Sequence, residues 1–536
     1  MSVASRAADP ARSGVAAQSA LDAAQAADVP ATPATMPGLL TIGVMAATIM
    51  QILDSTIANV ALPHMQASLG ATADTVTWVL TSYIIASAAA IPITGWLADR
   101  LGSRRLFLIS VVGFVLASMA CGLAQNLDQM VIFRVFQGIF AAFLNPLSQS
   151  VMLDINRPSR HARAMSIWGM GIMIGPILGP LLGGWLTENY NWRWVFYVNV
   201  PIGILCFAVL SALLPSRPLR RRKFDLFGFS LLAIAIGALQ LMLDRGQAND
   251  WFQSTEVIIE AGVSLAAWWM FAVHMLTARN PMFDRAMLAN RNLVTSLIFM
   301  LVVGLVVMAV MALLPPLLQT LYGYPVLDTG LLLMPRGVGV LISMAVAGQL
   351  IQRGFDTRIL IGTGTLLTAY SLYTMTQWTL VMGSSPIVLS GLIQGLGMGL
   401  IFIPLNVTAF ATLQPQYRTE ASSLLNLCRN LGASVGISIC TTVLARNLQI
   451  SHADLAGQVT AYNTGNIDPA ITAILGSTGD TMLAALNGEV TRQAAMIAYL
   501  DDFWMMMILT GLSVFLVLFL RKPKLAAKAD PKDLPH

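Results

Sequence analysis

Apolar segments long enough to cross a lipid bilayer recur along the whole chain. Fourteen runs are present, with approximate bounds 38–62, 76–97, 105–124, 129–151, 163–187, 194–214, 226–243, 255–277, 292–318, 327–350, 357–379, 386–411, 420–445 and 498–520. A transmembrane helix needs about 20 apolar residues, and only helices and closed barrels satisfy their backbone polar groups inside lipid. The sequence therefore predicts an all-α integral membrane protein with fourteen transmembrane helices.

The composition argues against a soluble enzyme. Only 11% of the 536 residues are charged, whereas soluble domains carry about 25% charged residues. The five histidines do not cluster, and the sequence contains no metal-ligand spacing and no GxxxxGK[ST] loop for nucleotide phosphates. We expect no enzymatic activity, no metal, no cofactor and no nucleic-acid partner, and we expect an ion gradient to drive any transport.

Lysine and arginine indicate the orientation of the chain. If the N-terminus is cytoplasmic, 24 of the 31 Lys and Arg residues lie inside, four lie outside, and Arg134, Arg336 and Arg429 lie within spans. Cytoplasmic loops are enriched in these residues. We therefore predict that both termini are cytoplasmic.

Short repeats divide the chain. Gly95-x-Leu97-x-x-Arg100 returns as Gly348-x-Leu350-x-x-Arg353, Gln137-Gly138 returns as Gln394-Gly395, and Gly175 and Gly179 return as Gly432 and Gly436. Such repeats predict two homologous six-helix bundles, the arrangement that secondary transporters use for alternating access. We expect a disordered cytoplasmic tail (1–37), a first bundle (38–214), a linker with two extra helices (215–291), a second bundle with a long periplasmic loop at about 446–497 (292–520), and a basic cytoplasmic tail (521–536). The loop is either a cap that contacts a partner or a loose connector.

One acid lies inside the first apolar run. An aspartate within a span is costly unless it is paired, hydrated or protonated, and helix rise places Asp54 and Arg134 at similar depth in the outer half of the membrane. A nearby cation and burial act on the proton affinity of a carboxylate in opposite directions, so the pair is a candidate for proton coupling. A static ion pair and a solvated Asp54 remain alternatives.

A charged turn follows the second span. Its candidate gate residues are Gly95, Asp99, Arg100, Gly102, Arg104 and Arg105, and Asp154 at the inner end of the fourth span is a candidate partner for the arginines. The cluster predicts a latch on the cytoplasmic side. Simple positive-inside anchoring explains the arginines but neither Asp99 nor the glycines.

The fifth span is rich in residues that weaken helices, namely Gly171, Gly175, Pro176, Gly179, Pro180, Gly183 and Gly184. Proline interrupts helical hydrogen bonding, and glycine permits close packing between membrane helices. We expect a helix that bends between conformations or seals the bundle interface; a purely structural packing helix is the alternative.

Polar and aromatic residues within the spans provide candidates for a central substrate pocket. They are Gln51, Tyr83, Gln137, Asn145, Gln149, Trp168, Gln319, Asn406 and Asn426. Because none of these is charged, the set favours bulky lipophilic solutes over sugars or zwitterions. Some of these residues could instead only bridge helices.

Several motifs together resemble one family. Residues 53–63, LDSTIANVALP, resemble the first-helix motif of the fourteen-span drug:proton antiporters of the major facilitator superfamily, the EmrB/QacA type. The turn at 95–105 resembles motif A of the superfamily, Arg134-x-x-Gln137-Gly138 its motif B, and residues 171–184 the antiporter motif C. Ser103 in motif A and Ala58 in the first-helix motif depart from the usual residues. The resemblance covers about 38–445.

The resemblance implies a fold and a function. The fold would be two six-helix bundles with two extra helices between them, and the function would be proton-driven export of lipophilic drugs or toxic compounds across the bacterial inner membrane. Some members of this family work with a periplasmic adaptor and an outer-membrane channel. Dedicated export of one endogenous siderophore, lipid or antibiotic is the alternative; motif C disfavours an uptake symporter.

Overall fold

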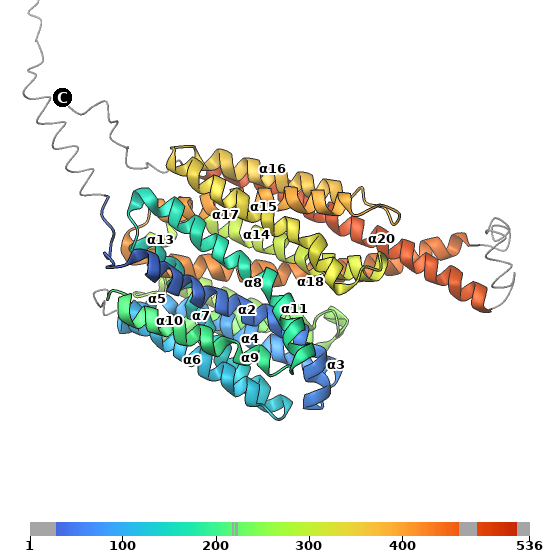
Figure 1. The fold of residues 1–536 in the computed structure, drawn as a ribbon, viewed down its shortest axis with the longest axis horizontal. Coiled ribbons are helices and arrows are strands. Elements are labelled where there is room, and N and C mark those ends of the chain that lie inside the picture. The colour runs from blue at the N-terminus through green and yellow to red at the C-terminus, as the bar shows by residue number, and fades with distance from the viewer. Residues whose placement is uncertain (1–27, 217–218, 220–222, 460–479, 522–536) are drawn as a thin grey trace, which may run out of the picture.

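Long helices run side by side through the molecule (Figure 1). The structure is a computed structural model that describes residues 28–216, 219, 223–459 and 480–521. The main helices of the first half are α2 (Pro37–Leu69), α4 (Trp78–Ala90), α5 (Thr94–Leu101), α6 (Ser103–Leu123), α7 (Leu127–Asp154), α8 (His161–Asn189) and α10 (Asn199–Leu213). Short helices α3 (Ala73–Val76) and α9 (Trp194–Tyr197) precede α4 and α10.

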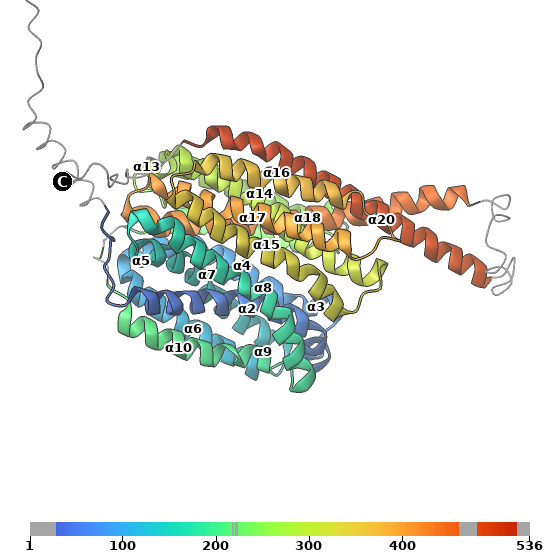
Figure 2. The ribbon, with the colours of Figure 1, turned by 45° about the horizontal axis from the view of Figure 1, so that its top comes forward.

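The second half repeats this pattern. After α11 (Leu226–Arg245), α12 (Thr255–Thr277) and the short α13 (Arg285–Leu288), its helices are α14 (Arg291–Pro316), α15 (Val326–Gln352), α16 (Thr357–Met375), α17 (Ser385–Ala411), α18 (Arg418–Gln458) and α20 (Asp480–Ser513). Helix α2 packs on α8 and α4 on α7, as α14 packs on α18 and α15 on α17. Figures 1 and 2 show the helices of each half grouped on their own side of the molecule.

Glycines fix the equivalent contacts in the two halves. A Cβ atom on Gly175 of α8 would lie 2.6 Å from Ile52 of α2, and one on Gly179 would meet Thr56. In the second half, Gly432 and Gly436 of α18 lie in the same way against Leu301 and Leu305 of α14. Glycine lets membrane helices approach this closely, so the repeat found in the sequence corresponds to a repeated helix contact.

One of the two extra helices, α11, lies beside both halves. Helix α11 packs on α4, where Thr81 donates a hydrogen bond to Asp244, and Ser438 of α18 donates to the carbonyl oxygen of Leu243 at 2.9 Å. Helix α12 packs on α11, and Ser264 donates to the carbonyl oxygen of Ala235 at 3.0 Å.

Thirteen helices of the described residues are long and apolar enough to cross a membrane. The predicted span at 357–379 is α16, which is not among them because Thr, Ser and Tyr side chains lower its hydropathy. Its polar groups are nevertheless satisfied, since Thr365 and Thr368 donate to carbonyl oxygens one turn earlier at 2.7 and 2.9 Å.

The long loop predicted at 446–497 is largely helical, and the last span begins earlier than predicted. Helix α18 continues to Gln458 and α20 begins at Asp480, while residues 460–479 lie outside the described residues. The two extensions lie side by side and project beyond the other helices (Figures 1 and 2), joined by hydrogen bonds from Asn447 to Asp501 at 3.1 Å and between His452 and Asn487 at 3.0 Å. The sequence prediction used hydropathy, which detects only the apolar part of a helix. The backbone hydrogen bonds of α18 and α20 continue beyond that part into polar sequence.

The end of the predicted N-terminal tail contacts the helices. Residues 1–27 lie outside the described residues, but Asp28 accepts hydrogen bonds from the backbone and hydroxyl of Ser159 at 2.9 and 2.7 Å. The amide of Thr32 donates to the carbonyl oxygen of Asp154 at 3.0 Å. For these residues the prediction of disorder is wrong, because polar loop groups offer partners that composition does not reveal.

Candidate functional site

Asp54 and Arg134 form an ion pair in the interior of the first half. Asp54 lies on α2 and Arg134 on α7, both side chains are 0% exposed, and Arg134 Nη1 donates to Asp54 Oδ2 at 2.8 Å. The predicted proximity of the two side chains is confirmed, and the alternative of a solvated Asp54 is wrong. Burying two charges is costly unless further hydrogen bonds satisfy them, so their other partners matter.

Two amides complete the surroundings of the carboxylate. Gln137 Nε2 and Asn199 Nδ2 each donate to Asp54 Oδ1 at 2.8 Å. Asn199 also donates to Ser118 Oγ at 3.0 Å, which in turn donates to the carbonyl oxygen of Phe196 at 2.9 Å. Asn199 was missed as a site residue in the sequence, where it is an amide near the start of an otherwise apolar run, in a stretch (191–203) that also resembles the family.

The guanidinium of Arg134 is held on several sides. Its Nε donates to the carbonyl oxygen of Val79 at 2.9 Å and its Nη1 also to Gln137 Oε1 at 2.8 Å. It lies over the ring of Tyr83, with 4.4 Å from Cζ to the centroid, and near Phe196 at 5.5 Å. Stacking on an aromatic face adds a cation–π attraction, so the position of Arg134 is strongly constrained.

The backbone brings these side chains together. Asn126 caps the start of α7 by accepting a hydrogen bond from the Gln129 amide at 2.9 Å. A Cβ atom on Gly138 would lie 2.5 Å from the carbonyl oxygen of Tyr83, so glycine is required where α7 crosses α4. This crossing places Arg134, one turn earlier, and Gln137, the preceding residue, against α4 and α2.

The arrangement suits an ionised Asp54. The carboxylate accepts three N–H donors, and an ionised carboxylate is a pure acceptor. A protonated Asp54 needs an acceptor for its own O–H, which requires that a donor withdraws or that a neighbouring amide turns its oxygen toward the acid.

The glycine-rich face of α8 packs on α2 within the first half. Gly171 faces Met45, Gly175 faces Ile52, Gly179 faces Thr56 and Gly183 approaches the backbone of Ile57. A Cβ atom on Gly184 would meet nothing within 4 Å. Helix α8 stays continuous through Pro176 and Pro180. This face is therefore a packing surface next to Asp54, while Gly169 of the same helix faces Met344 and Ile403 of the second half.

Polar side chains join the two halves on the side where the N-terminal segment lies. Gln149 of α7 donates to Asn406 of α17 and accepts from Ser422 and Asn426 of α18. Ser150 and Thr419 share a hydrogen bond of 2.8 Å. We call these residues, with Asp154 and Arg418, the inter-bundle contact.

The inter-bundle contact ends in a buried ion pair. Arg418 Nη1 donates to Asp154 Oδ1 at 3.1 Å, so α18 supplies a cation for Asp154 that sequence reasoning did not include. Next to it, a Cβ atom on Gly95 would lie 3.0 Å from the Glu420 side chain. The access path between the halves is closed on this side.

The charged turn of motif A lies beside this closure. Gly102 has a φ of +88° between α5 and α6, a conformation that favours glycine. Arg104 donates to the carbonyl oxygen of Ser211 on α10, and Arg100 lies over the ring of Trp96 at 5.4 Å. Asp99 is also engaged with other groups, while Arg105 is exposed.

The nine predicted pocket residues do not form one pocket. Gln137 and Tyr83 belong to the surroundings of Asp54 and Arg134, and Gln149, Asn406 and Asn426 to the inter-bundle contact. Trp168 is buried, donates to Ser148 Oγ at 3.0 Å and stacks on Phe402 at 6.3 Å. The side-chain amide oxygens of Gln51 and Asn145 are buried without a hydrogen-bond partner among the described residues. Gln319 is exposed in a π-helical turn after α14.

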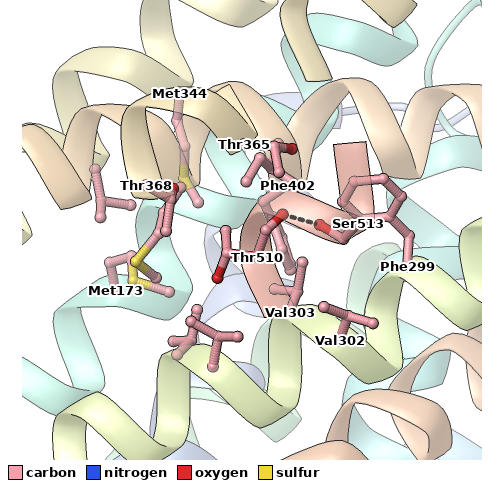
Figure 3. Close-up of a pocket in the computed structure, with 15 residues that line it drawn as sticks. Met173, Phe299, Val302, Val303, Met344, Thr365, Thr368, Phe402, Thr510 and Ser513 are labelled. Atoms are coloured by element: carbon pink, nitrogen blue, oxygen red, sulfur yellow. Dashed lines mark hydrogen bonds between the residues drawn. The ribbon is translucent and has the colours of Figure 1, made fainter. Parts of the chain in front are cut away.

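A cavity instead lies mainly inside the second half (Figure 3). It comprises about 510 Å³ of space outside the atoms, part of it open to the surroundings, and is lined by Met173 of α8 and by residues of α14, α15, α16, α17 and α20, including Phe299, Val303, Met344 and Phe402. Sequence reasoning missed it because it searched for amide and aromatic polar residues, whereas eleven of the fifteen lining side chains are apolar and the other four are Thr or Ser.

Three features define a membrane transporter of the secondary type. They are two similar halves of membrane-crossing helices, a buried ion pair, and contacts that close one side between the halves. The model of the Major Facilitator Superfamily matches residues 44–437. The chain belongs to this superfamily, as the sequence motifs predicted.

Individual relatives agree with the family. Multidrug export protein EmrB of Escherichia coli K12 is 38% identical over 491 residues, covering 90% of this chain and 93% of the relative. Fatty acid resistance protein FarB of Neisseria gonorrhoeae is 34% identical over 482 residues, covering 89% and 94%. The solved proton:xylose symporter XylE is similar in fold, with a TM-score of 0.58 at 12% identity over 90% of this chain and 95% of XylE. The predicted fold class is confirmed.

Proposed function

We propose that this protein exports lipophilic drugs or toxic compounds from the bacterial cytoplasm in exchange for protons. The similarity to EmrB over nearly the full length supports the export of drugs. The observation that carries proton coupling is the buried Asp54, which accepts hydrogen bonds from Arg134, Gln137 and Asn199.

The exchange rests on competition between a proton and the hydrogen-bond donors for the carboxylate of Asp54. In the described conformation the carboxylate is satisfied as an anion while the inter-bundle contact closes the side that carries the N-terminal segment. Both termini are cytoplasmic in this proposal, which the Lys and Arg distribution supports. A proton that arrives from the periplasm displaces a donor from Asp54, frees α2 from α7 or α10, and favours opening towards the cytoplasm, where substrate enters and the proton leaves.

A periplasmic adaptor and an outer-membrane channel are further proposed partners. The extensions of α18 and α20 support this, because they project beyond the other helices and offer a surface outside the lipid (Figure 1). Export of one endogenous lipid is the second candidate, favoured by the similarity to FarB. A resistance screen with dyes and fatty acids side by side in an efflux-deficient strain separates the two candidates.

The substitution Asp54→Asn tests coupling. Asparagine keeps the volume of the side chain but cannot bind or release a proton, so we expect inverted vesicles to lose proton-driven dye efflux while membrane insertion is unchanged. Asp128→Asn is the matched control, because Asp128 is an exposed acid in the first turn of α7. Full efflux by the Asp54→Asn protein would overturn the proposal.

A further inference from the structure

Arg336 is a buried cation without a carboxylate partner. It lies on α15 and is 7% exposed. Its hydrogen bonds are long, from Nη2 to the carbonyl oxygen of Val307 at 3.4 Å and to Met398 Sδ at 3.7 Å. No acid within the described part of the chain pairs with it, whereas the buried Arg134 and Arg418 each have an aspartate. A guanidinium carries five donors, so most of its capacity is unused.

The cavity of the second half lies next to this cation. Val307 and Met398, the two residues that contact the guanidinium, both line the cavity. The remaining wall is apolar, and its few hydroxyls are engaged within their own helices, as for Thr365, Thr368 and Ser513 (Figure 3). Arg336 is not itself a lining residue, so its positive charge lies directly behind the wall that Val307 and Met398 form.

The repeat shows which residue of the second half occupies the position equivalent to Asp54. In the first half, Ile52 and Thr56 of α2 face the glycines of α8; in the second half, Leu301 and Leu305 of α14 face the glycines of α18. This register places Val303 where the first half has Asp54. Val303 lines the cavity, so cavity space occupies the position equivalent to Asp54. Gly391 is the counterpart of Arg134, and Arg336 of α15 lies beside it, since a Cβ atom on Gly391 would lie 3.6 Å from Arg336 Cβ.

We propose that the cavity binds a lipophilic anion whose carboxylate or other acidic group pairs with Arg336 and whose apolar body lies among Val303, Phe299 and Met344. The ligand supplies the negative charge that the second half lacks. This inference rests on the proposed export function and defines a substrate class for it. Three of the lining residues are methionines, Met173, Met344 and Met398, and their flexible side chains adapt to apolar bodies of different shape.

Binding of decanoate to the purified protein in lipid nanodiscs tests the site, with decanol as the uncharged analogue and empty nanodiscs as background. We expect decanoate to bind about ten-fold or more tightly than decanol, and Arg336→Gln to remove most of that difference, because hydrogen bonds to a charged group are the strong ones. Arg429→Gln is the matched control, since Arg429 also lies within a span of the second half, on α18, and forms no salt bridge among the described residues. It should leave the preference for decanoate unchanged.

A second variant tests the cavity itself. Val303→Phe fills the space, so we expect it to weaken decanoate and decanol alike, and this holds even if the Arg336→Gln protein fails to fold. Equal affinity of the wild-type protein for decanoate and decanol, unchanged binding in folded Arg336→Gln, or unchanged binding in Val303→Phe would each overturn the proposal. The assay needs no proton gradient, so its outcome is independent of whether Asp54 couples transport.

Discussion

Asp54 shows how much a single residue in an apolar run can reveal. Helix rise and direction were enough to predict that Arg134 lies at its depth, and the two side chains are 2.8 Å apart. The third and fourth members of the group were harder to find. Gln137 was assigned to a substrate pocket, and Asn199 was not assigned, because amides inside membrane helices have no single role and depth alone does not give the direction in which a side chain points.

The role of Asn199 can be tested separately from that of the acid. Asn199→Ala removes one of three donors to Asp54, a hydrogen bond to a charged group worth about 1.5–3 kcal/mol. We expect proton-driven efflux to fall about ten-fold or more, while substrate exchange without a proton gradient continues. Asn189→Ala is the control, because Asn189 is exposed and bonds only to its own helix. Equal efflux by both variants would argue against a role for Asn199 in coupling.

Helix α8 illustrates what a glycine pattern does and does not specify. The pattern predicted an unusual fifth span, but a hinge, a seal and a packing surface all require small residues. The residues that face each glycine identify the packing contacts. Gly179 lies against Thr56 of α2, and a Cβ atom on Gly184 would meet nothing within 4 Å. The prediction of helix ends has a similar limit. Hydropathy located the apolar part of α20 but did not show that the helix begins at Asp480.

A pair of equal substitutions separates packing from flexibility. Gly179→Ala places a methyl group against Thr56, and such overpacking costs about 1–3 kcal/mol. We expect a lower midpoint of thermal unfolding in detergent and reduced efflux. Gly184→Ala should leave the midpoint unchanged or raise it. If both variants lose efflux with unchanged midpoints, flexibility of α8, rather than its contact with α2, is what transport requires.

The complete molecule depends on contacts that no single motif predicts. The repeats indicated two bundles, and the packing of the helices agrees with that division, but the sequence could not show which side is closed. Apart from the Asp154–Arg418 pair, the residues that close it, such as Gln149, Ser150 and Thr419, are neutral, and their partners lie more than 250 positions away. The cavity beside Arg336 could not be predicted from any single motif either, because residues of five helices of the second half form its wall.

Alternating access predicts that locking the inter-bundle contact stops transport. The hydroxyls of Ser150 and Thr419 are 2.8 Å apart, so cysteines at these positions lie within reach of a disulfide. In a protein without its four native cysteines, we expect oxidation of Ser150→Cys/Thr419→Cys to abolish efflux and reduction to restore it. Each single variant should be unaffected by oxidant. Continued efflux by the fully cross-linked protein would mean that the two halves need not separate here.

Helix α18 gives these movements a mechanical consequence. It is one continuous rod of 41 residues, about 60 Å long, with Arg418 at one end in the inter-bundle contact and the other end in the extension that accompanies α20. A small tilt at Arg418 becomes a large displacement at the far tip. A tilt that releases Arg418 from the inter-bundle contact would therefore also displace the extension at the opposite end of the same helix.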